Sequence, residues 1–390
     1  MIADSPAPAN TGVDGSGRPA RLPELDGIRG MAMLLVLVWH YIACTSLAPP
    51  GTPGGYGIKA LSMTWAGVDL FFVLSGYLIG GILIDNRASP NYFQAFYARR
   101  FCRIFPLYYL SLGLFAFAVN AEWGRKSPWL FDGPLPIWAY ATYLQNFVMA
   151  SSASLGSNWM GPTWSLAIEE QFYVVLPLAV RLLPPVTLRK LLTILVFSAP
   201  VLRGALFLWY PSGALAAYVL LPGRWDALFL GVLGAFAVRQ PEARAWLITH
   251  RGRIRGAVVG GVVVTTWLLV NGQGVYSIGM TFYGHTVLAV MCLGLLLLAS
   301  LGPGGFTRRL FSHPLLVWIG TISYGIYIVH QPMLGFAHAW LREQRPRIAD
   351  SADAWITLVA LLLTFAVATA SWRFFERPIV QYGRRIRYDR

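Results

Sequence analysis

The sequence has little charge and few cysteines. Only 12% of its 390 residues are Asp, Glu, Lys or Arg, whereas 56% are hydrophobic. This balance excludes an ordinary soluble domain, in which about 25% of the residues are charged. The three cysteines, Cys44, Cys102 and Cys292, lie in separate apolar stretches without a CxxC pair. They indicate neither a disulfide framework nor a metal centre, and we expect no metal ion.

Acidic residues are scarcer than basic ones, 17 against 31, and the formal net charge is +14. An excess of positive charge is a common sign of nucleic-acid binding. Here, however, the basic residues fall between apolar runs and form no single face interleaved with aromatic residues. We therefore expect no nucleic-acid partner. The sequence also contains no internal repeat and no separate soluble domain.

Long apolar runs recur along the whole chain. A helix crosses a bilayer core with about 20 mostly apolar residues. Ten segments reach about that length: 25–47, 65–84, 101–119, 164–183, 190–209, 223–239, 254–270, 282–301, 315–336 and 354–374. They predict an all-α, polytopic membrane protein with a single bundle of about ten transmembrane helices. A further segment, 136–150, is short and rich in Trp and Tyr, which favours an interfacial or re-entrant element.

The distribution of Lys and Arg predicts the orientation of the bundle. If the N-terminus is cytoplasmic, the inner segments hold most basic residues and the outer loops hold only Lys59, Arg125, Lys126, Arg342, Arg345 and Arg347. This bias follows the positive-inside rule and places both termini in the cytoplasm. Residues 1–21 are rich in Pro, Gly, Ala and Ser, which predicts a disordered cytoplasmic tail. Residues 22–380 then form the transmembrane domain, and 381–390 a basic cytoplasmic tail.

Two ionisable side chains, Arg29 and His40, lie in the first predicted span, and they argue against a cleaved signal peptide there. They are eleven residues apart, which is about three helical turns and about 16 Å of depth, so we predict that both project from one face. Arg100 and Arg103 begin the third span at the same end. Further ionisable residues lie near the outer helix ends or past mid-membrane: Asp69, Glu169, Glu170, Arg203, Arg224, Asp226 and His330.

A charge that faces lipid costs several kcal/mol, so these residues are expected to line a protein-enclosed or wet space. The basic inner end suits a phosphate-bearing ligand, because guanidinium groups match phosphate oxygens. A deep histidine suits proton abstraction near neutral pH. The pattern therefore favours group transfer from a phosphorylated carrier to an acceptor hydroxyl. A transporter or flippase for a lipid-linked or anionic substrate also fits buried charges along a path.

Each of these residues also has a structural explanation. The arginines at the inner end can act as cytoplasmic anchors. Glu169 and Glu170 lie in the first turn after Pro162, where a carboxylate interacts favourably with the helix dipole. Arg224 and Asp226 can form a structural charge pair near the outer interface.

Seven segments, taken in order, resemble the membrane acyltransferase 3 family, which O-acylates sugars, polysaccharides and some macrolides. They are LDGIRGMAMLLVLVWH (25–40), GVDLFFVLSGYLIGGIL (67–83), FYARRFCRIFPLYYL (96–110), TWSLAIEEQFYVVLP (163–177), RWDALFLGVLGA (224–235), SYGIYIVHQP (323–332) and FFERP (374–378). The resemblance covers about residues 22–380. It is to short members that stand alone without a fused SGNH-type domain.

The resemblance implies roles for particular residues. His40 matches the family's catalytic base, and Arg29 matches an arginine that the family requires. Arg100 and Arg103 match a pair implicated in binding acyl-CoA, and Glu169 matches a glutamate for which we expect a role in acceptor binding or imidazole orientation. The remaining candidates are supporting or acceptor-binding residues: Glu170, Asp69, Ser75, Trp164, Arg224, Asp226, Tyr324 and His330.

The resemblance also implies the reactants and the location. The donor is acyl-CoA, most simply acetyl-CoA, which acts as a co-substrate and not as a bound cofactor. The acceptor is a carbohydrate or a glycosylated small molecule such as a macrolide, and it is expected to approach from the outer side. The family implies a multi-pass protein of the bacterial inner membrane.

Overall fold

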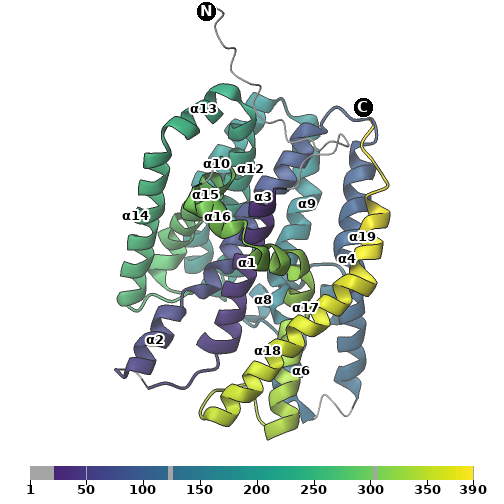
Figure 1. The fold of residues 1–390 in the computed structure, drawn as a ribbon, viewed down its shortest axis with the longest axis vertical. Helices are drawn as coiled ribbons and strands as arrows, with labels where there is room; N and C mark the ends of the chain where they lie inside the picture. The colour runs from purple at the N-terminus through teal and green to yellow at the C-terminus, as the bar shows by residue number, and fades with distance from the viewer. Residues whose placement is uncertain (1–21, 50, 122–125, 302–304, 390) are drawn as a thin grey trace, which may run out of the picture.

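The structure is a computed structural model that describes residues 22–49, 51–121, 126–301 and 305–389. Helices dominate the described residues, and none of those residues forms a strand (Figure 1). One isolated bridge joins Ser46 to Ile348. The all-α prediction is therefore confirmed. The predicted tail, 1–21, lies outside the described residues.

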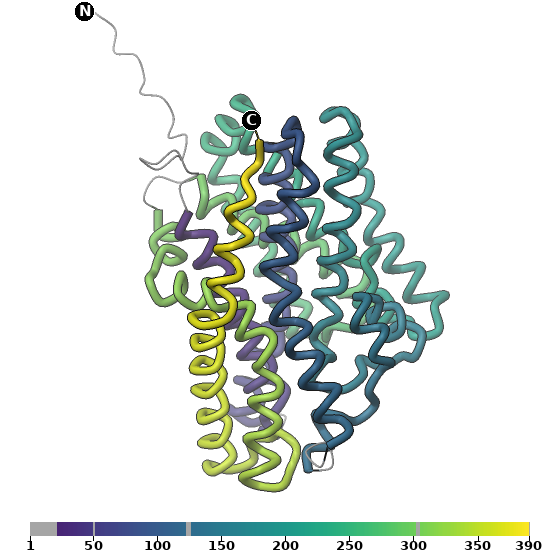
Figure 2. The backbone as a smooth tube through the Cα atoms, turned by 90° about the vertical axis from the view of Figure 1, so that its right-hand side faces the viewer, coloured from purple at the N-terminus to yellow at the C-terminus, as the bar shows by residue number. Residues whose placement is uncertain are grey.

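Each predicted span corresponds to one long helix. The ten helices are α1 (Pro23–Val38), α3 (Gly67–Asp85), α4 (Tyr92–Asn120), α9 (Trp164–Leu182), α10 (Pro185–Trp209), α12 (Leu221–Arg239), α14 (Arg251–Val270), α15 (His285–Ser300), α17 (Pro314–Arg342) and α18 (Ser351–Ser371). Shorter helices join or extend them: α2 (Pro53–Leu61), α6 (Pro128–Phe131), α11 (Ala214–Val219), α13 (Pro241–Thr249), α16 (Phe306–Phe311) and α19 (Arg377–Gly383). Figure 2 shows α18 and α19 as one continuous run beside α4.

Within the described residues, eight helical segments are long and apolar enough to cross a membrane, which confirms a polytopic membrane protein. The two long helices that fall short are α9 and α17. Helix α9 carries Glu169 and Glu170, and α17 carries His330 and Gln331. Helix α9 packs against α3, and α17 packs against α1 and α18. Three of these polar side chains, Glu169, Glu170 and His330, are ones that the sequence marks as functional.

The segment 136–150 forms no span. It consists of α7 (Ile137–Ala141) and α8 (Gln145–Ser152). The two short helices meet at Tyr143, whose φ of 55° breaks the helical path. The prediction of a short element is therefore confirmed.

Glycines hold two helix pairs in backbone contact. A Cβ built on Gly30 would lie 2.0 Å from the Leu316 carbonyl oxygen, and one on Gly320 would lie 1.8 Å from the Asp26 carbonyl oxygen. Helix α1 therefore presses directly on α17. Gly76 and Gly231 allow the same close approach between α3 and α12. Small residues permit such contacts within membranes, where helices gain stability from tight packing.

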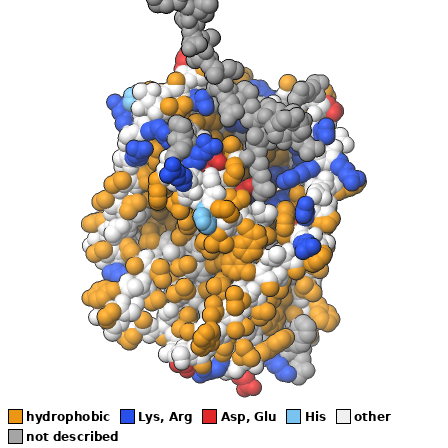
Figure 3. All heavy atoms as spheres, viewed as in Figure 1, with side chains coloured by type: hydrophobic (Ala, Val, Ile, Leu, Met, Phe, Trp, Pro, Cys, Tyr) orange, Lys and Arg blue, Asp and Glu red, His pale blue; other side chains and the backbone are white. Residues whose placement is uncertain are grey.

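Basic side chains gather at one end of the molecule. In Figure 3 they are concentrated in the upper half of the face shown, and the lower half is mainly hydrophobic. The upper end is where α13 and the C-terminus lie in Figure 1. Residues 386–389 pack on α4 there, because Asn91 and Arg99 donate to the Arg387 and Ile386 carbonyls at 2.8 Å each.

Candidate active site

His40 lies in a π-helical turn, Trp39–Ala43, which follows α1 directly. Such turns insert an extra residue into a helix and are frequent at functional sites. The adjacent Tyr41 fixes the turn against two helices: its hydroxyl donates to the His330 carbonyl at 2.7 Å and shares a hydrogen bond of 2.7 Å with Thr364. His40 is therefore held at the junction of α1, α17 and α18.

The ring of His40 faces α17. Its Nδ1 atom lies 2.7 Å from the Gln331 side-chain nitrogen, and its ring centroid lies 5.0 Å from that of His330. The Nδ1 atom of His330 lies 2.7 Å from the Tyr327 carbonyl oxygen. Because a carbonyl only accepts hydrogen bonds, this Nδ1 carries the proton of neutral His330. The structure thus places the predicted His330 beside His40.

Arg29, Arg100 and Arg103 form a cluster of guanidinium groups on α1 and α4, which we call the arginine cluster. Arg103 interacts electrostatically with Arg29 and with Arg100. Arg29 pairs with Asp26 at 2.7 Å, and the cluster also interacts electrostatically with Glu169, Glu170 and Glu376. Aromatic rings lie beside it: Arg103 lies 5.3 Å from the Trp372 ring and 5.9 Å from that of Tyr324, and Arg100 lies 6.0 Å from the Tyr173 ring. Arg100 and Arg103 form no ion pair within 4.0 Å among the described residues, which leaves their guanidinium groups available to an anion.

Glu169 lies beside the arginine cluster. Tyr173 donates to its carboxylate at 3.2 Å, and the Tyr173 hydroxyl also lies 2.9 Å from that of Ser75. Glu169 interacts electrostatically with Arg100 and Arg29. Its neighbour Glu170 has one buried carboxylate oxygen, Oε1, without a partner. The glutamates of α9 therefore face the same region as the arginines of α1 and α4.

These polar side chains lie in one region of the bundle, which we call the central space. They come from α1 and the turn that follows it, and from α3, α4, α9 and α17. Each of them is only partly buried, although each lies in a largely apolar bundle. The residues concerned are Arg29, His40, Ser75, Arg100, Arg103, Glu169, Glu170, Tyr324 and Tyr327.

A second polar cluster lies on α3, α10, α12 and α15, and we call it the charge network. Asp69 accepts from Arg224 at 2.5 Å, and Asp226 accepts from Arg203 at 2.8 Å. The His285 Nδ1 lies 4.0 Å from Asp69. All five side chains are at most 2% exposed. The predicted acceptor residues Asp69, Arg224 and Asp226 are therefore sealed from the central space and paired within the bundle.

Trp164 covers the charge network. Its ring lies 4.4 Å from that of Tyr218, centroid to centroid, and packs edge-on against Phe72 at 6.0 Å. Both partner rings contact the Arg224 guanidinium. Trp164, the first residue of α9, thus belongs to an aromatic layer that borders the charge network.

The structure adds residues that the sequence did not single out. Gln331 contacts His40, Tyr173 joins Glu169 to Ser75, and Tyr327 links α17 to α9 through a 2.9 Å hydrogen bond with Ser165. Each lies one to four residues from a predicted site residue on the same helix. That spacing was the sequence signal that could have identified them. His285, which the sequence analysis also did not single out, is buried beside Asp69.

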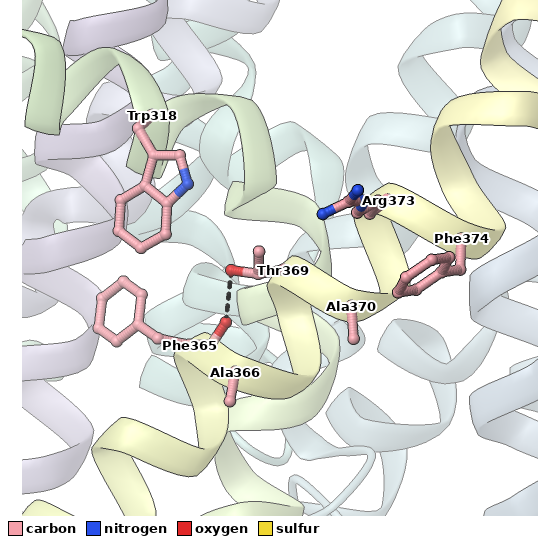
Figure 4. Close-up of a pocket in the computed structure, with 7 residues that line it drawn as sticks. All are labelled: Trp318, Phe365, Ala366, Thr369, Ala370, Arg373 and Phe374. Carbon is pink, nitrogen blue, oxygen red and sulfur yellow. Dashed lines mark hydrogen bonds between the residues drawn. The ribbon is translucent and has the colours of Figure 1, made fainter.

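A groove of about 450 Å³ lies apart from these clusters, on the surface between α17 and α18 (Figure 4). Its lining is mainly apolar: Trp318, Phe365, Ala366, Thr369, Ala370, Arg373 and Phe374. Thr369 donates to the Phe365 carbonyl at 2.7 Å. None of the candidate site residues lines the groove. Among the described residues, no group of His, Cys, Asp or Glu side chains is arranged to hold a metal ion.

Comparison with known proteins identifies the family. The model of the acyltransferase 3 family, described as an acyltransferase domain, matches residues 22–373. The peptidoglycan O-acetyltransferase OatA of Listeria monocytogenes is 28% identical over 387 residues, covering 93% of this chain and 56% of the relative. The O-acetyltransferase OatA of Staphylococcus aureus is 26% identical, covering 94% of this chain and 58% of the relative.

The chain therefore spans somewhat more than half the length of these relatives. No solved structure matches. The family match extends over nearly all of the transmembrane bundle and includes the residues of the arginine cluster and His40. The chain belongs to the acyltransferase 3 family and has a multi-pass, all-α membrane fold.

Proposed function

We propose that this protein transfers an acyl group, most simply acetyl, from cytoplasmic acyl-CoA to a hydroxyl of a carbohydrate or a glycosylated small molecule. One observation carries the proposal: Arg29, Arg100 and Arg103 form a part-exposed cluster on α1 and α4, and α1 leads directly into the turn that carries the part-exposed His40. Guanidinium groups match the phosphates of CoA in charge and geometry. An imidazole supplies the base that a hydroxyl nucleophile needs.

In the proposed reaction, His40 removes the proton from the acceptor hydroxyl. The oxygen attacks the thioester carbonyl carbon, and the carbon–sulfur bond breaks as the ester forms. The CoA thiolate then takes the proton from the imidazolium and leaves as the thiol, so that His40 returns to its neutral form. A variant of this route, in which His40 first carries the acyl group itself, uses the same residues.

Glu169 is proposed to align the donor side of the reaction. It interacts with Arg29 and Arg100, whereas the polar side chain that contacts His40 is Gln331. The interaction of Glu169 with the arginines supports a role in holding those arginines or the acceptor. The contact between Gln331 and His40 argues against a role for Glu169 in orienting the imidazole. Ser75 and Tyr173 hold its carboxylate in place.

The acceptor is proposed to be a carbohydrate that approaches from the outer side of a bacterial inner membrane. The names of the relatives, which include a peptidoglycan O-acetyltransferase, support a carbohydrate hydroxyl. The basic residues at the end that holds the C-terminus support a cytoplasmic position for that end, as the positive-inside rule requires. Donor and acceptor then meet from opposite faces of the membrane.

The experiment is turnover of radiolabelled acetyl-CoA by the purified protein, with and without a carbohydrate acceptor. We expect His40→Ala to lower transfer by about 10²-fold to 10⁴-fold, the usual contribution of a positioned base. His250→Ala, a change at an exposed histidine that stacks on Trp246, is the matched control and should leave turnover unchanged. Undiminished transfer by folded His40→Ala would overturn the proposal. Acceptor movement across vesicles without ester formation would instead favour a transporter.

A further inference from the structure

Gln331 contacts the proposed base, His40, directly. Within the described part of the chain, the amide of Gln331 makes the one side-chain hydrogen bond of His40, at 2.7 Å to Nδ1. Gln331 itself is buried, and its amide oxygen has no hydrogen-bond partner. The other ring nitrogen, Nε2, makes no hydrogen bond and is not among the fully buried atoms without a partner. Nε2 is therefore the ring nitrogen of His40 that remains accessible to a reactant.

The position of the proton on the neutral imidazole of His40 decides whether Nε2 can serve as the base. A neutral imidazole has one N–H group and one nitrogen with a lone pair. Nε2 can accept a proton from a hydroxyl only when the ring proton is on Nδ1. Nδ1–H in turn needs a hydrogen-bond acceptor opposite it. A glutamine amide offers either an N–H donor or a carbonyl acceptor at almost the same position, since its two ends have nearly the same shape.

We propose that Gln331 is a positioning residue that selects the reactive tautomer of His40. In the structure its nitrogen faces Nδ1, which makes Nδ1 the acceptor and leaves the proton on Nε2. A half-turn of the amide brings its oxygen to Nδ1–H and leaves the lone pair on Nε2. The oxygen loses no hydrogen bond in this turn, because it has no partner in its present position. The inference rests on the proposed role of His40 as the base.

His330 does not compete for this role. Its Nδ1 donates to a carbonyl, so its Nε2 keeps a lone pair, but that atom is buried and the side chain is 0% exposed. His330 is also the titratable group that interacts electrostatically with His40. Helix α2, which packs on the π-helical turn, contributes Lys59, whose amine donates to the Val270 carbonyl at 3.0 Å. The tautomer of His40 therefore depends on Gln331.

Two substitutions at one position test the proposal. Gln331→Leu removes both amide functions, and Gln331→Glu offers oxygen acceptors alone. The measurements are kcat and KM for acetyl-CoA from pH 5 to 9, together with gel filtration and thermal unfolding to establish folding. Gln344→Leu is the matched control, because Gln344 bonds Asp353, outside the central space.

We expect Gln331→Leu to lower kcat by about 10-fold, the value of one hydrogen bond, with KM for acetyl-CoA unchanged. Gln331→Glu should keep kcat near the natural value. Its carboxylate stabilises protonated His40, so the acidic limb of the pH profile should move to higher pH. A folded Gln331→Leu protein with full kcat, or a Gln331→Glu protein as slow as Gln331→Leu, would overturn the inference.

A second measurement reads the tautomer without any reaction. The chain has six histidines, so ¹⁵N-histidine labelling gives a simple spectrum, and His40→Ala identifies the signals of His40. Gln331→Glu should show Nδ1–H at His40, and loss of that preference in Gln331→Leu supports the assignment. Identical His40 spectra in the two variants would contradict it. If His40→Ala retains activity, the proposed function fails; if it does not but Gln331→Leu is unaffected, only the role of Gln331 fails.

Discussion

The central space and the charge network are both polar regions inside an apolar bundle, but they satisfy their polar groups differently. In the charge network, Asp69, Arg203, Arg224 and Asp226 pair with one another and are at most 1% exposed. Around the central space, the arginine cluster repels itself, and its members keep accessible surface. The arginines of the charge network each form a close ion pair, whereas in the arginine cluster Arg29 pairs with Asp26 and no ion pair within 4.0 Å is formed by Arg100 or Arg103 among the described residues.

This difference follows from the cost of burying charge. A fully buried ion without a partner costs several kcal/mol, so the charge network persists because its charges cancel. A site that must accept a phosphate-bearing ligand cannot cancel its own charge completely, and it avoids the cost by remaining accessible. The comparison shows that two properties of a charged side chain must be considered together: whether it has an ion-pair partner and whether it is exposed. Paired, buried charges support the fold, whereas part-exposed charges are available to a substrate.

The largest expected effect comes from breaking the charge network. Arg224→Leu leaves Asp69 without its 2.5 Å partner, and such a loss costs about 3 to 5 kcal/mol. Removing both charges in Asp69→Leu/Arg224→Leu should restore most of that stability. Thermal unfolding of the three purified proteins in detergent measures the effect.

A double variant that is as unstable as Arg224→Leu would show that the pair is not a self-contained unit. The turnover of the double variant sharpens the comparison further. If acetyl-CoA hydrolysis persists while KM for the acceptor rises, the charge network also contributes to acceptor binding, as the sequence motifs predict.

The next effect concerns the arginine cluster. Arg103→Ala removes one guanidinium from the proposed phosphate site, and charge-assisted hydrogen bonds contribute about 1.5 to 3 kcal/mol. We expect KM for acetyl-CoA to rise about 10-fold to 100-fold with little change in kcat. Arg103→Lys should recover only part of the affinity, since an ammonium lacks the planar fork.

Lys190→Ala is the control for net charge, because Lys190 is exposed at the start of α10, outside the arginine cluster. Steady-state kinetics across a range of acetyl-CoA concentrations distinguishes the two variants. An equal rise in KM for Arg103→Ala and Lys190→Ala would mean that the basic residues attract acetyl-CoA only through their combined electrostatic field.

The smallest effect is expected at Asp350, which caps α18 outside both polar regions. The backbone N–H of Asp353 and the Arg342 guanidinium lower the pKa of Asp350 below its ordinary value. A carboxyl with a lowered pKa stabilises the fold above its ordinary pKa of about 3.9 and loses that contribution as the pH falls through the lowered value. Asp350→Ala should therefore lower the melting temperature slightly, on the order of 1 °C, at pH 7.

The difference in melting temperature between Asp350→Ala and the natural protein should begin to narrow below about pH 4, and it should vanish as the pH falls through the lowered pKa of Asp350. Paired melting curves at pH 7 and pH 3.5 provide the measurement. Asp132→Ala, at an exposed carboxylate outside the helices, serves as the comparison. A gap that widens on acidification would contradict the proposed cap.

The sequence predicted the helices well because each span is a long apolar run. All ten runs became helices, and the short segment 136–150 was recognised by its length and its aromatic residues. The placement of Arg29, Arg100 and Arg103 near one another was also foreseeable, since all three were predicted at the inner helix ends. Glu169 was predicted near the outer helix end, and its electrostatic interaction with Arg29 and Arg100 corrects that prediction.

Contacts between distant segments were beyond the reach of the sequence. Gln331 is 291 residues from His40 in the chain, and its role depends on the close packing of α1 on α17 through Gly30 and Gly320. Asp69 and Arg224 likewise meet across 155 residues. Helical periodicity gives the face of each helix but not its rotation against a neighbour, so the sequence did not separate the charge network from the central space.

The polar character of α9 and α17 has a consequence for how the protein is made. Each of these helices carries too many polar residues to rank with the eight apolar ones, so neither is expected to leave the translocon and enter lipid readily by itself. Helix α17 packs on α1, which is synthesised almost 300 residues earlier. We therefore expect the insertion of α17, which carries Gln331, to depend on contact with helices such as α1 that are already in the membrane.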